Sequence, residues 1–144
     1  TQLFNYQPNT KNTVIDSIKT KKEIKITKLS KKELKKNILS SIEKWKNAWE
    51  RTDMSNYLDS YSANFIYPNN MSKLQWKKYR TSRIVSKKTI NILISNVKVK
   101  FAKEKIIATF TQSYKSGKLN QVSTKILTFI EEEGEWHILE ETSK

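Results

Sequence analysis

Three polar residues that could bind a ligand lie in two neighbouring segments of the chain's second half. Gln112 and Tyr114 follow Phe110 at every second position, and Lys125 lies within the next segment. Successive side chains of a strand point to opposite faces, so Gln112 and Tyr114 share a face. If a turn at residues 116–121 pairs the two segments with Gln112 opposite Lys125, that face is apolar at one end and polar at the other. Such a face is typical of a pocket with a few convergent donors.

An upstream helical segment supplies two further candidates, Tyr79 and Arg83. Both could reach the same pocket mouth, where two cations beside a tyrosine suit a ligand that carries a carboxylate. The alternative is structural: Lys125 and Gln112 finish a sheet edge, while Arg83 reaches water or pairs with Glu140. Both interpretations stay open, and the pocket predicted from the sequence consists of Tyr79, Arg83, Gln112, Tyr114 and Lys125.

Other kinds of chemistry find little support in the residue types. The chain has no cysteine and one histidine, so it lacks a thiolate nucleophile and the usual ligands of a transition metal. We predict no metal and no cofactor. His137 would face away from its two neighbours, as a surface or internally satisfied residue. The acids are poorly placed for catalysis, because Asp53 has the position of a helix cap, Asp59 lies off the aromatic stripe and residues 131–133 fall in a turn. We therefore predict no catalytic residue.

Net charge is the strongest global feature. The chain has 28 Lys and Arg residues against 14 Asp and Glu, which gives a net charge of +14. Residues 1–36 contain ten lysines and three acids, a net of +7, so half of the excess lies in the first quarter of the chain. Such a field favours anionic partners but specifies none of them. Most rings fall at core spacing rather than among the cations, which argues against nucleic-acid binding outside the basic leader.

The elements that must position these side chains begin after residue 29. We predict a basic, flexible leader at residues 1–29 and one domain at residues 30–144. Ser30 and Glu33 form a capping-box pattern that opens a helix. Its apolar side chains step by three and four and share one stripe, namely Leu34, Ile38, Ile42, Trp45 and Trp49. No apolar run approaches the roughly 20 residues of a membrane span, and the first residue is Thr1, which suggests a processed or excised form.

Two shorter helices and a sheet follow. Asp53 is a suitable N-cap for the second helix, and the Ser72 to Gln75 segment opens the third, with a brief strand expected at residues 64–67. From residue 90 the apolar period changes to two, which is typical of strands. The inward positions switch from even to odd between Ile94 and Val97, which predicts a β-bulge near residues 95–96. Three further strands are predicted at 106–114, 121–130 and 136–140, in an antiparallel meander.

This order of elements resembles the nuclear transport factor 2-like superfamily, whose helices close over a curved sheet to form a cone. Residues 35–141 resemble one branch of it, the C-terminal domain of bacterial periplasmic L,D-transpeptidase-type enzymes, which include cell-shape-determining L,D-carboxypeptidases. The resemblance rests on the order and spacing of several motifs: Trp45-x-x-x-Trp49, Asp53, Tyr57, Tyr61, Phe65, Trp76-x-x-x-Arg80-x-x-Arg83, Phe110-x-Gln112-x-Tyr114, Lys125-x-Leu127 and Gly134-x-Trp136-x-Ile138-x-Glu140. It implies an α+β fold with three N-terminal helices packed on a strongly curved four-stranded antiparallel meander.

The resemblance also implies a function class. The transpeptidase reaction uses a cysteine with a histidine, so a chain without cysteine would be the noncatalytic accessory domain of a bacterial cell-envelope protein. Such a domain would be periplasmic or secreted and would bind a peptidoglycan fragment, an envelope protein or a second copy of itself through the open sheet face. Two alternatives remain: a small cone-fold enzyme of the isomerase or dehydratase type, and a basic nucleic-acid-binding module.

Overall fold

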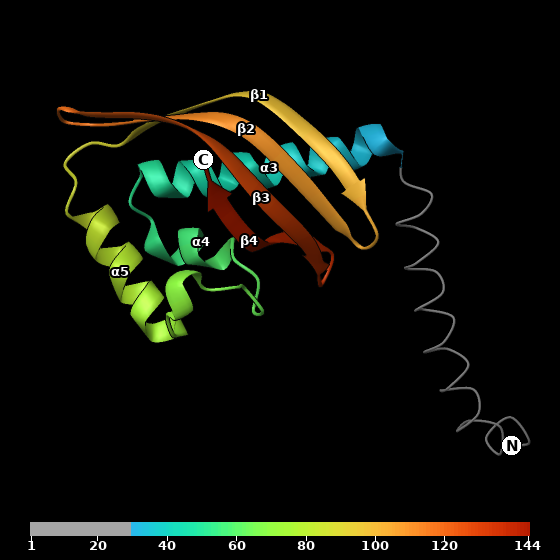
Figure 1. Ribbon diagram of the computed structural model, residues 1–144, viewed down its shortest axis with the longest axis horizontal. Helices are drawn as coiled ribbons and strands as arrows, with labels where there is room; N and C mark the ends of the chain where they lie inside the picture. Colours follow the sequence, from blue (N-terminus) through green and yellow to red (C-terminus); the bar gives the residue numbers. More distant parts are fainter. Residues whose placement is uncertain (1–29) are drawn as a thin grey trace, which may run out of the picture. The chain divides into compact units, whose positions relative to one another are not determined.

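The computed structural model describes residues 30–144 of the chain (Figure 1). The leader predicted at residues 1–29 lies outside the described residues. The chain divides into two units, residues 1–34 and residues 35–144.

Within residues 30–144, three α-helices and one short 3₁₀ helix precede the sheet, as α3 Lys31–Glu50, α4 Met54–Asp59, η1 Pro68–Asn70 and α5 Lys73–Val85. The predicted caps are present. The Ser30 hydroxyl accepts from the backbone N–H of Glu33, the Asp53 carboxylate accepts from the N–H of Asn56, and Ser72 forms a complete capping box with Gln75. These side chains satisfy backbone donors that a helix start leaves unpaired, which fixes where each helix begins.

The second half forms one antiparallel meander, with β1 Asn91–Ala102, β2 Lys105–Ser116, β3 Leu119–Glu132 and β4 Glu135–Ser143 in the order β1-β2-β3-β4. Each strand is followed by the next through a two-residue turn. Glu104, Gly117 and Gly134 adopt positive φ angles in these turns, a conformation that tight hairpins require. The three helices lie on one side of the curved sheet (Figure 1), which confirms the predicted α+β cone.

The sheet contains two bulges, of which one was predicted. The β1–β2 register shifts between Ser95 and Lys98, and Asn96 has a positive φ of 55°, as the change of apolar period indicated. The second bulge lies in β4, where Thr128 pairs with Glu140 but Phe129 pairs with Ile138. The extra residue, Leu139, reverses the alternation of β4. As a result Glu141, not Glu140, points to the same face as the buried Leu127 with which it pairs.

The predicted register of the central hairpin is wrong by two residues. Lys125 pairs with Phe110 and Gln112 pairs with Ser123, because the turn consists of residues 117–118 alone and both strands run longer than expected. A slip of two preserves the alternation of faces. Gln112 and Lys125 therefore still lie on the inner face of the sheet, and both are buried, with 6% and 7% of their surface exposed.

Aromatic side chains connect the helices to the sheet. Trp45 of α3 packs edge-on against Phe110 of β2, with 6.3 Å between ring centroids, and Trp49 stacks on Tyr114 at 5.4 Å. Residues 64–67, predicted as a brief strand, do not form one. Instead Tyr61 makes a parallel bridge to Ile138, and the Ile66 N–H donates to the carbonyl of Leu139. The segment is thus held to β4 by single contacts rather than by a ladder.

Candidate ligand-binding site

The five residues predicted as a pocket line one cavity of about 660 Å³, to which α5 and strands β2, β3 and β4 contribute side chains. Tyr79 and Arg83 reach it from α5, Gln112 and Tyr114 from β2, and Lys125 from β3. We call this cavity the mouth pocket. Trp49, Arg80 and Glu141 complete its inner wall. The five predicted residues thus share one cavity, although the surroundings of the individual side chains differ from those expected.

Lys125 forms the main ion pair of the mouth pocket. Its Nζ donates to Oε2 of Glu141 over 2.6 Å, and 9% of the lysine side chain and 18% of the glutamate side chain are exposed. The pair joins β3 to β4 diagonally, because Lys125 pairs with Ser143 and Glu141 with Leu127. The other carboxylate oxygen of Glu141 accepts from the Tyr61 hydroxyl over 2.6 Å. Glu141 is therefore held at both oxygens.

Buried hydroxyl groups extend this network into the core. The Tyr61 oxygen accepts from Nε1 of Trp45 over 3.0 Å and lies 3.0 Å from the Tyr57 oxygen. Tyr57 in turn accepts from Nε of Arg80 over 3.0 Å. A continuous series of hydrogen bonds thus links two cations, Arg80 and Lys125, through two tyrosines and one carboxylate. Networks of this kind are rigid because each member fixes the orientation of the next.

Arg80 is the inward cation of α5, a position that the sequence analysis gave to Arg83. Its guanidinium lies over the rings of Trp49 and Tyr57, at 5.4 and 5.6 Å from the centroids. Arg83 is exposed and lies over the Tyr79 ring at 4.9 Å. The proposed pairing of Arg83 with Glu140 does not occur, since the β4 bulge turns Glu140 outward. Trp76, Arg80 and Ile84, four residues apart, form the inner side of α5, and Arg83 stands at the rim.

The network shifts the proton affinities of its members. Burial alone would raise the pKa of the Glu141 carboxyl, but Lys125 and the hydrogen bond from Tyr61 hold that pKa below its ordinary value. Burial alone would lower the pKa of the Arg80 guanidinium, yet the neighbouring Tyr57 and Tyr61 oxygens and Glu141 raise it. Burial raises the pKa of Tyr57 to about 12 and raises that of Tyr61 well above 10.0. At neutral pH Glu141 is therefore a carboxylate, Arg80 a cation, and Tyr57 and Tyr61 neutral phenols.

Gln112 is the one buried side chain of the mouth pocket whose acceptor atom has no partner among the described residues. Its Oε1 is inaccessible to solvent and makes no hydrogen bond. A buried polar atom without a partner costs roughly 1–3 kcal/mol. The pocket that Gln112 lines has an excess of positive charge, with Arg80, Arg83, Lys87 and Lys125 opposed by Glu141 alone.

Sequence reasoning missed Arg80 and Glu141 as site residues for identifiable reasons. Arg80 was available from the spacing, because it follows Trp76 by four residues and lies one turn along the same face of the helix. Glu141 could not be found from period two alone, since the trace of the Leu139 bulge in the sequence is a single pair of adjacent apolar residues, Ile138 and Leu139. Tyr57 and Tyr61 were assigned to the core, where they lie, but their hydroxyls also belong to the site.

His137 has acidic neighbours rather than a ligand set. Its Nδ1 lies 3.5 Å from Oε1 of Glu132 and its Nε2 lies 4.0 Å from Oε2 of Glu135. In residues 30–144, no three His, Asp or Glu side chains are grouped to hold a metal ion. None of the helices in this range is long and apolar enough to cross a membrane.

The fold and the motifs together define a family. Residues 37–142 match the sequence profile of the Cds6 C-terminal NTF2-like domain. The chain therefore belongs to the family of Cds6 C-terminal NTF2-like domains, within the nuclear transport factor 2-like superfamily, as its motifs indicated. A search of curated proteins finds no match.

Solved structures with the same fold fall into two groups. Bd1075 from Bdellovibrio bacteriovorus is 20% identical, with a TM-score of 0.69, and the match covers 80% of this chain and 42% of that protein. A variant of the helical cell shape determining protein Pgp2 from Campylobacter jejuni is 23% identical, with a TM-score of 0.70 and coverage of 78% and 41%. A candidate dehydratase of the NTF2-like family from Streptomyces avermitilis is 12% identical, with a TM-score of 0.65 and coverage of 75% and 93%. The chain thus spans about two fifths of the first two proteins and most of the third.

Proposed function

We propose that this domain binds, without catalysis, a carboxylate-bearing ligand in the mouth pocket and serves as an accessory domain of a cell-envelope protein. The observation that carries the proposal is the buried cationic cluster, in which one carboxylate, Glu141, faces both Lys125 and Arg80. A second anion would be stabilised there by charge-assisted hydrogen bonds. The cell-shape protein Pgp2, which has a domain of the same fold, supports an envelope role and a periplasmic or secreted location.

The unpartnered Gln112 oxygen narrows the ligand chemistry. The Gln112 Oε1 is closed to solvent, so a ligand reaches it when the amide side chain turns toward the pocket. A bound group that then donates an N–H to this oxygen would remove the cost of the unpartnered acceptor. A ligand with a carboxylate near an amide N–H meets both requirements, and the stem peptide of peptidoglycan has these groups. We therefore propose a peptidoglycan fragment as the ligand, bound at Tyr79, Arg83, Gln112, Tyr114 and Lys125 together with Arg80.

The alternative of an acid–base enzyme fits the pocket less well. A general base that removes a proton from carbon works best with a pKa near neutrality. The pKa of Glu141 is shifted in the opposite direction, and both of its oxygens already accept hydrogen bonds. This arrangement favours binding over proton transfer.

The test removes the ion pair while leaving the net charge unchanged. The double variant Lys125→Gln/Glu141→Gln replaces two charges with two amides of similar size, and its affinity for a muropeptide tripeptide should fall about 10- to 100-fold, since a charge-assisted bond is worth about 1.5–3 kcal/mol. Titration calorimetry measures the affinity and circular dichroism the fold.

The matched control is Lys100→Gln/Glu140→Gln, which makes the same two substitutions at exposed positions. It should bind as the parent does. Equal affinity of the parent and the buried-pair variant, or no muropeptide binding by the parent, would overturn the proposal.

A further inference from the structure

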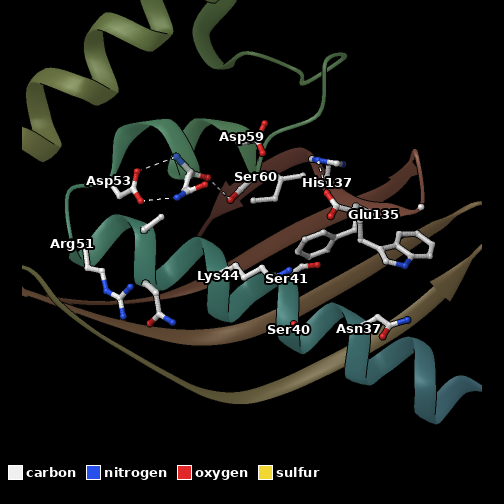
Figure 2. A pocket seen from close by; sticks show the side chains of 17 residues that line it. Asn37, Ser40, Ser41, Lys44, Arg51, Asp53, Asp59, Ser60, Glu135 and His137 are labelled. Atoms are coloured by element: carbon white, nitrogen blue, oxygen red, sulfur yellow. Dashed lines mark hydrogen bonds and ion pairs between the residues drawn. The ribbon is translucent and has the colours of Figure 1, made fainter.

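A second cavity, separate from the mouth pocket, lies between α3, α4 and the start of β4 and has a volume of about 670 Å³ (Figure 2). We call it the lateral groove. Asn37, Ser41 and Lys44 lie along α3 on one side of it, and Asp59 and His137 lie on the other. No residue predicted from the sequence as a binding residue lines it.

The lateral groove differs from the mouth pocket in charge. Two basic residues, Lys44 and Arg51, are balanced by three acidic ones, Asp53, Asp59 and Glu135. The chain as a whole has a net charge of +14, so this cavity is lined with unusually little positive charge. Besides His137 and Trp136, its remaining polar side chains are neutral amides and hydroxyls, namely Asn37, Ser40, Ser41, Asn47, Asn56 and Ser60. A groove of this composition is suited to an uncharged, hydroxyl-rich ligand.

Trp136, which also lines the groove, is exceptional among the four tryptophans. Trp45, Trp49 and Trp76 are buried and pack against other rings. Trp136 is half-buried, packs on no other aromatic ring and makes no hydrogen bond through its indole N–H to the described residues. A large ring left without an aromatic neighbour beside a groove is available for stacking.

Several polar side chains of the groove are also available to a ligand. Asp53, Asn56 and Ser60 use their side chains within the protein, in the cap of α4 and in a bond to a backbone carbonyl. The side chains of Asn37, Ser41 and Asn47 make no hydrogen bond to the described residues. Asn37 and Ser41 are about one helical turn apart on α3 and Asn47 lies six residues further on, which spreads donors and acceptors along the groove.

From these features we propose that the lateral groove binds an uncharged sugar, with one pyranose ring stacked on Trp136. The face of an indole ring is electron-rich and attracts the C–H groups that one face of a pyranose presents. The hydroxyl and amide groups of the sugar can then bond to the asparagine and serine side chains of α3, which donate and accept in the same way. This site is independent of the mouth pocket, since Trp136 does not line that pocket.

The test is a titration of the ¹⁵N-labelled chain with two uncharged probes, chitotetraose and cellotetraose, at millimolar concentrations. The indole N–H resonance of Trp136 and the side-chain amide resonances of Asn37 and Asn47 should shift with at least one probe. The indole resonances of Trp45, Trp49 and Trp76 report the buried core and should stay in place. The proposal is wrong if neither probe moves the Trp136 signal, or if the shifts map to the mouth pocket.

Variants then separate stacking from structure. Trp136→Ala should weaken the sugar affinity about tenfold or more, equivalent to about 1.4 kcal/mol, and Trp136→Phe should retain part of it because the ring persists. If Trp136→Ala does not fold, the phenylalanine variant and the titration of the parent decide the question. Unchanged affinity in a folded Trp136→Ala variant would overturn the proposal. Lys125→Gln/Glu141→Gln should bind the sugar as the parent does, so the two sites can fail separately.

Discussion

Replacing Glu141 with Gln should have opposite effects on stability and on ligand binding. The substitution keeps the size of the side chain and its acceptor for the Tyr61 hydroxyl, but it leaves Lys125 without its carboxylate partner. Two unit charges about 4 Å apart attract by about 4 kcal/mol at an effective dielectric constant of about 20. Part of this attraction is offset by the desolvation of both groups. We therefore expect the free energy of unfolding to fall by about 2–3 kcal/mol.

A loss of this size would lower the melting temperature by about 10 °C in a domain of this length. The same change should tighten the binding of a carboxylate ligand about tenfold, because the ligand no longer competes with Glu141 for the lysine. Thermal melts with and without muropeptide measure both effects, and Glu140→Gln is the control, since it removes the same charge from an exposed neighbour. A Glu141→Gln variant that melts with the parent, or that binds more weakly, would refute the reasoning.

The pH dependence of the same variant provides a further check. The folded-state pKa of Glu141 lies below its ordinary value of 4.5, so the carboxylate contributes stability above pH 4.5 that is lost as the pH falls through the folded pKa. The parent should therefore lose stability more steeply than Glu141→Gln below pH 4.5. Urea denaturation at a series of acidic pH values measures the free energy of unfolding of both proteins. The difference between the parent and Glu141→Gln should shrink as the pH falls.

Two other predictions concern the aromatic core. Trp49→Ala should lower the free energy of unfolding by roughly 3–5 kcal/mol, because Trp49 is buried and packs on Trp45, Tyr57 and Tyr114. Urea denaturation measures this loss. An unchanged urea midpoint would show that the apolar side of α3 does not contribute to the core. Tyr57 should ionise late, since burial raises its pKa from 10.0 to about 12, and stability should fall as the pH rises between these values. Ultraviolet absorbance of the phenolate follows this step, and Tyr57→Phe should remove one late-ionising group from the parent curve.

Most of the fold could be predicted from the sequence because local signals and long-range packing agree. The capping residues Ser30, Asp53 and Ser72 each begin a helix where expected. The β1 bulge was visible because the apolar residues on either side of it, Ile94 and Val97, change parity. A bulge leaves this trace only where inward residues are apolar on both sides of the extra residue.

The candidate site was harder to predict because small shifts of geometry decide which residues face it. On α5, Arg80 follows Trp76 by four residues and points inward, whereas Arg83 follows it by seven and lies at the rim of the mouth pocket. Two arginines of one motif thus have different surroundings. In the central hairpin the register error happened to be even, which kept Gln112 and Lys125 on the inner face. An error of one residue would have placed them on opposite faces and hidden the pocket.

The β4 bulge shows why the charge of the mouth pocket cannot be derived from alternation alone. Residues 138 and 139 are adjacent, apolar and both buried. A regular strand turns successive side chains to opposite faces, so one of the two would face solvent. The bulge interrupts this alternation at Leu139. The acid that follows at the inward position is then Glu141 rather than Glu140. Without the bulge, Lys125 would have no carboxylate beside it, and a buried charge without a partner is costly. The single extra residue thus decides whether Lys125 has an ion-pair partner in the mouth pocket.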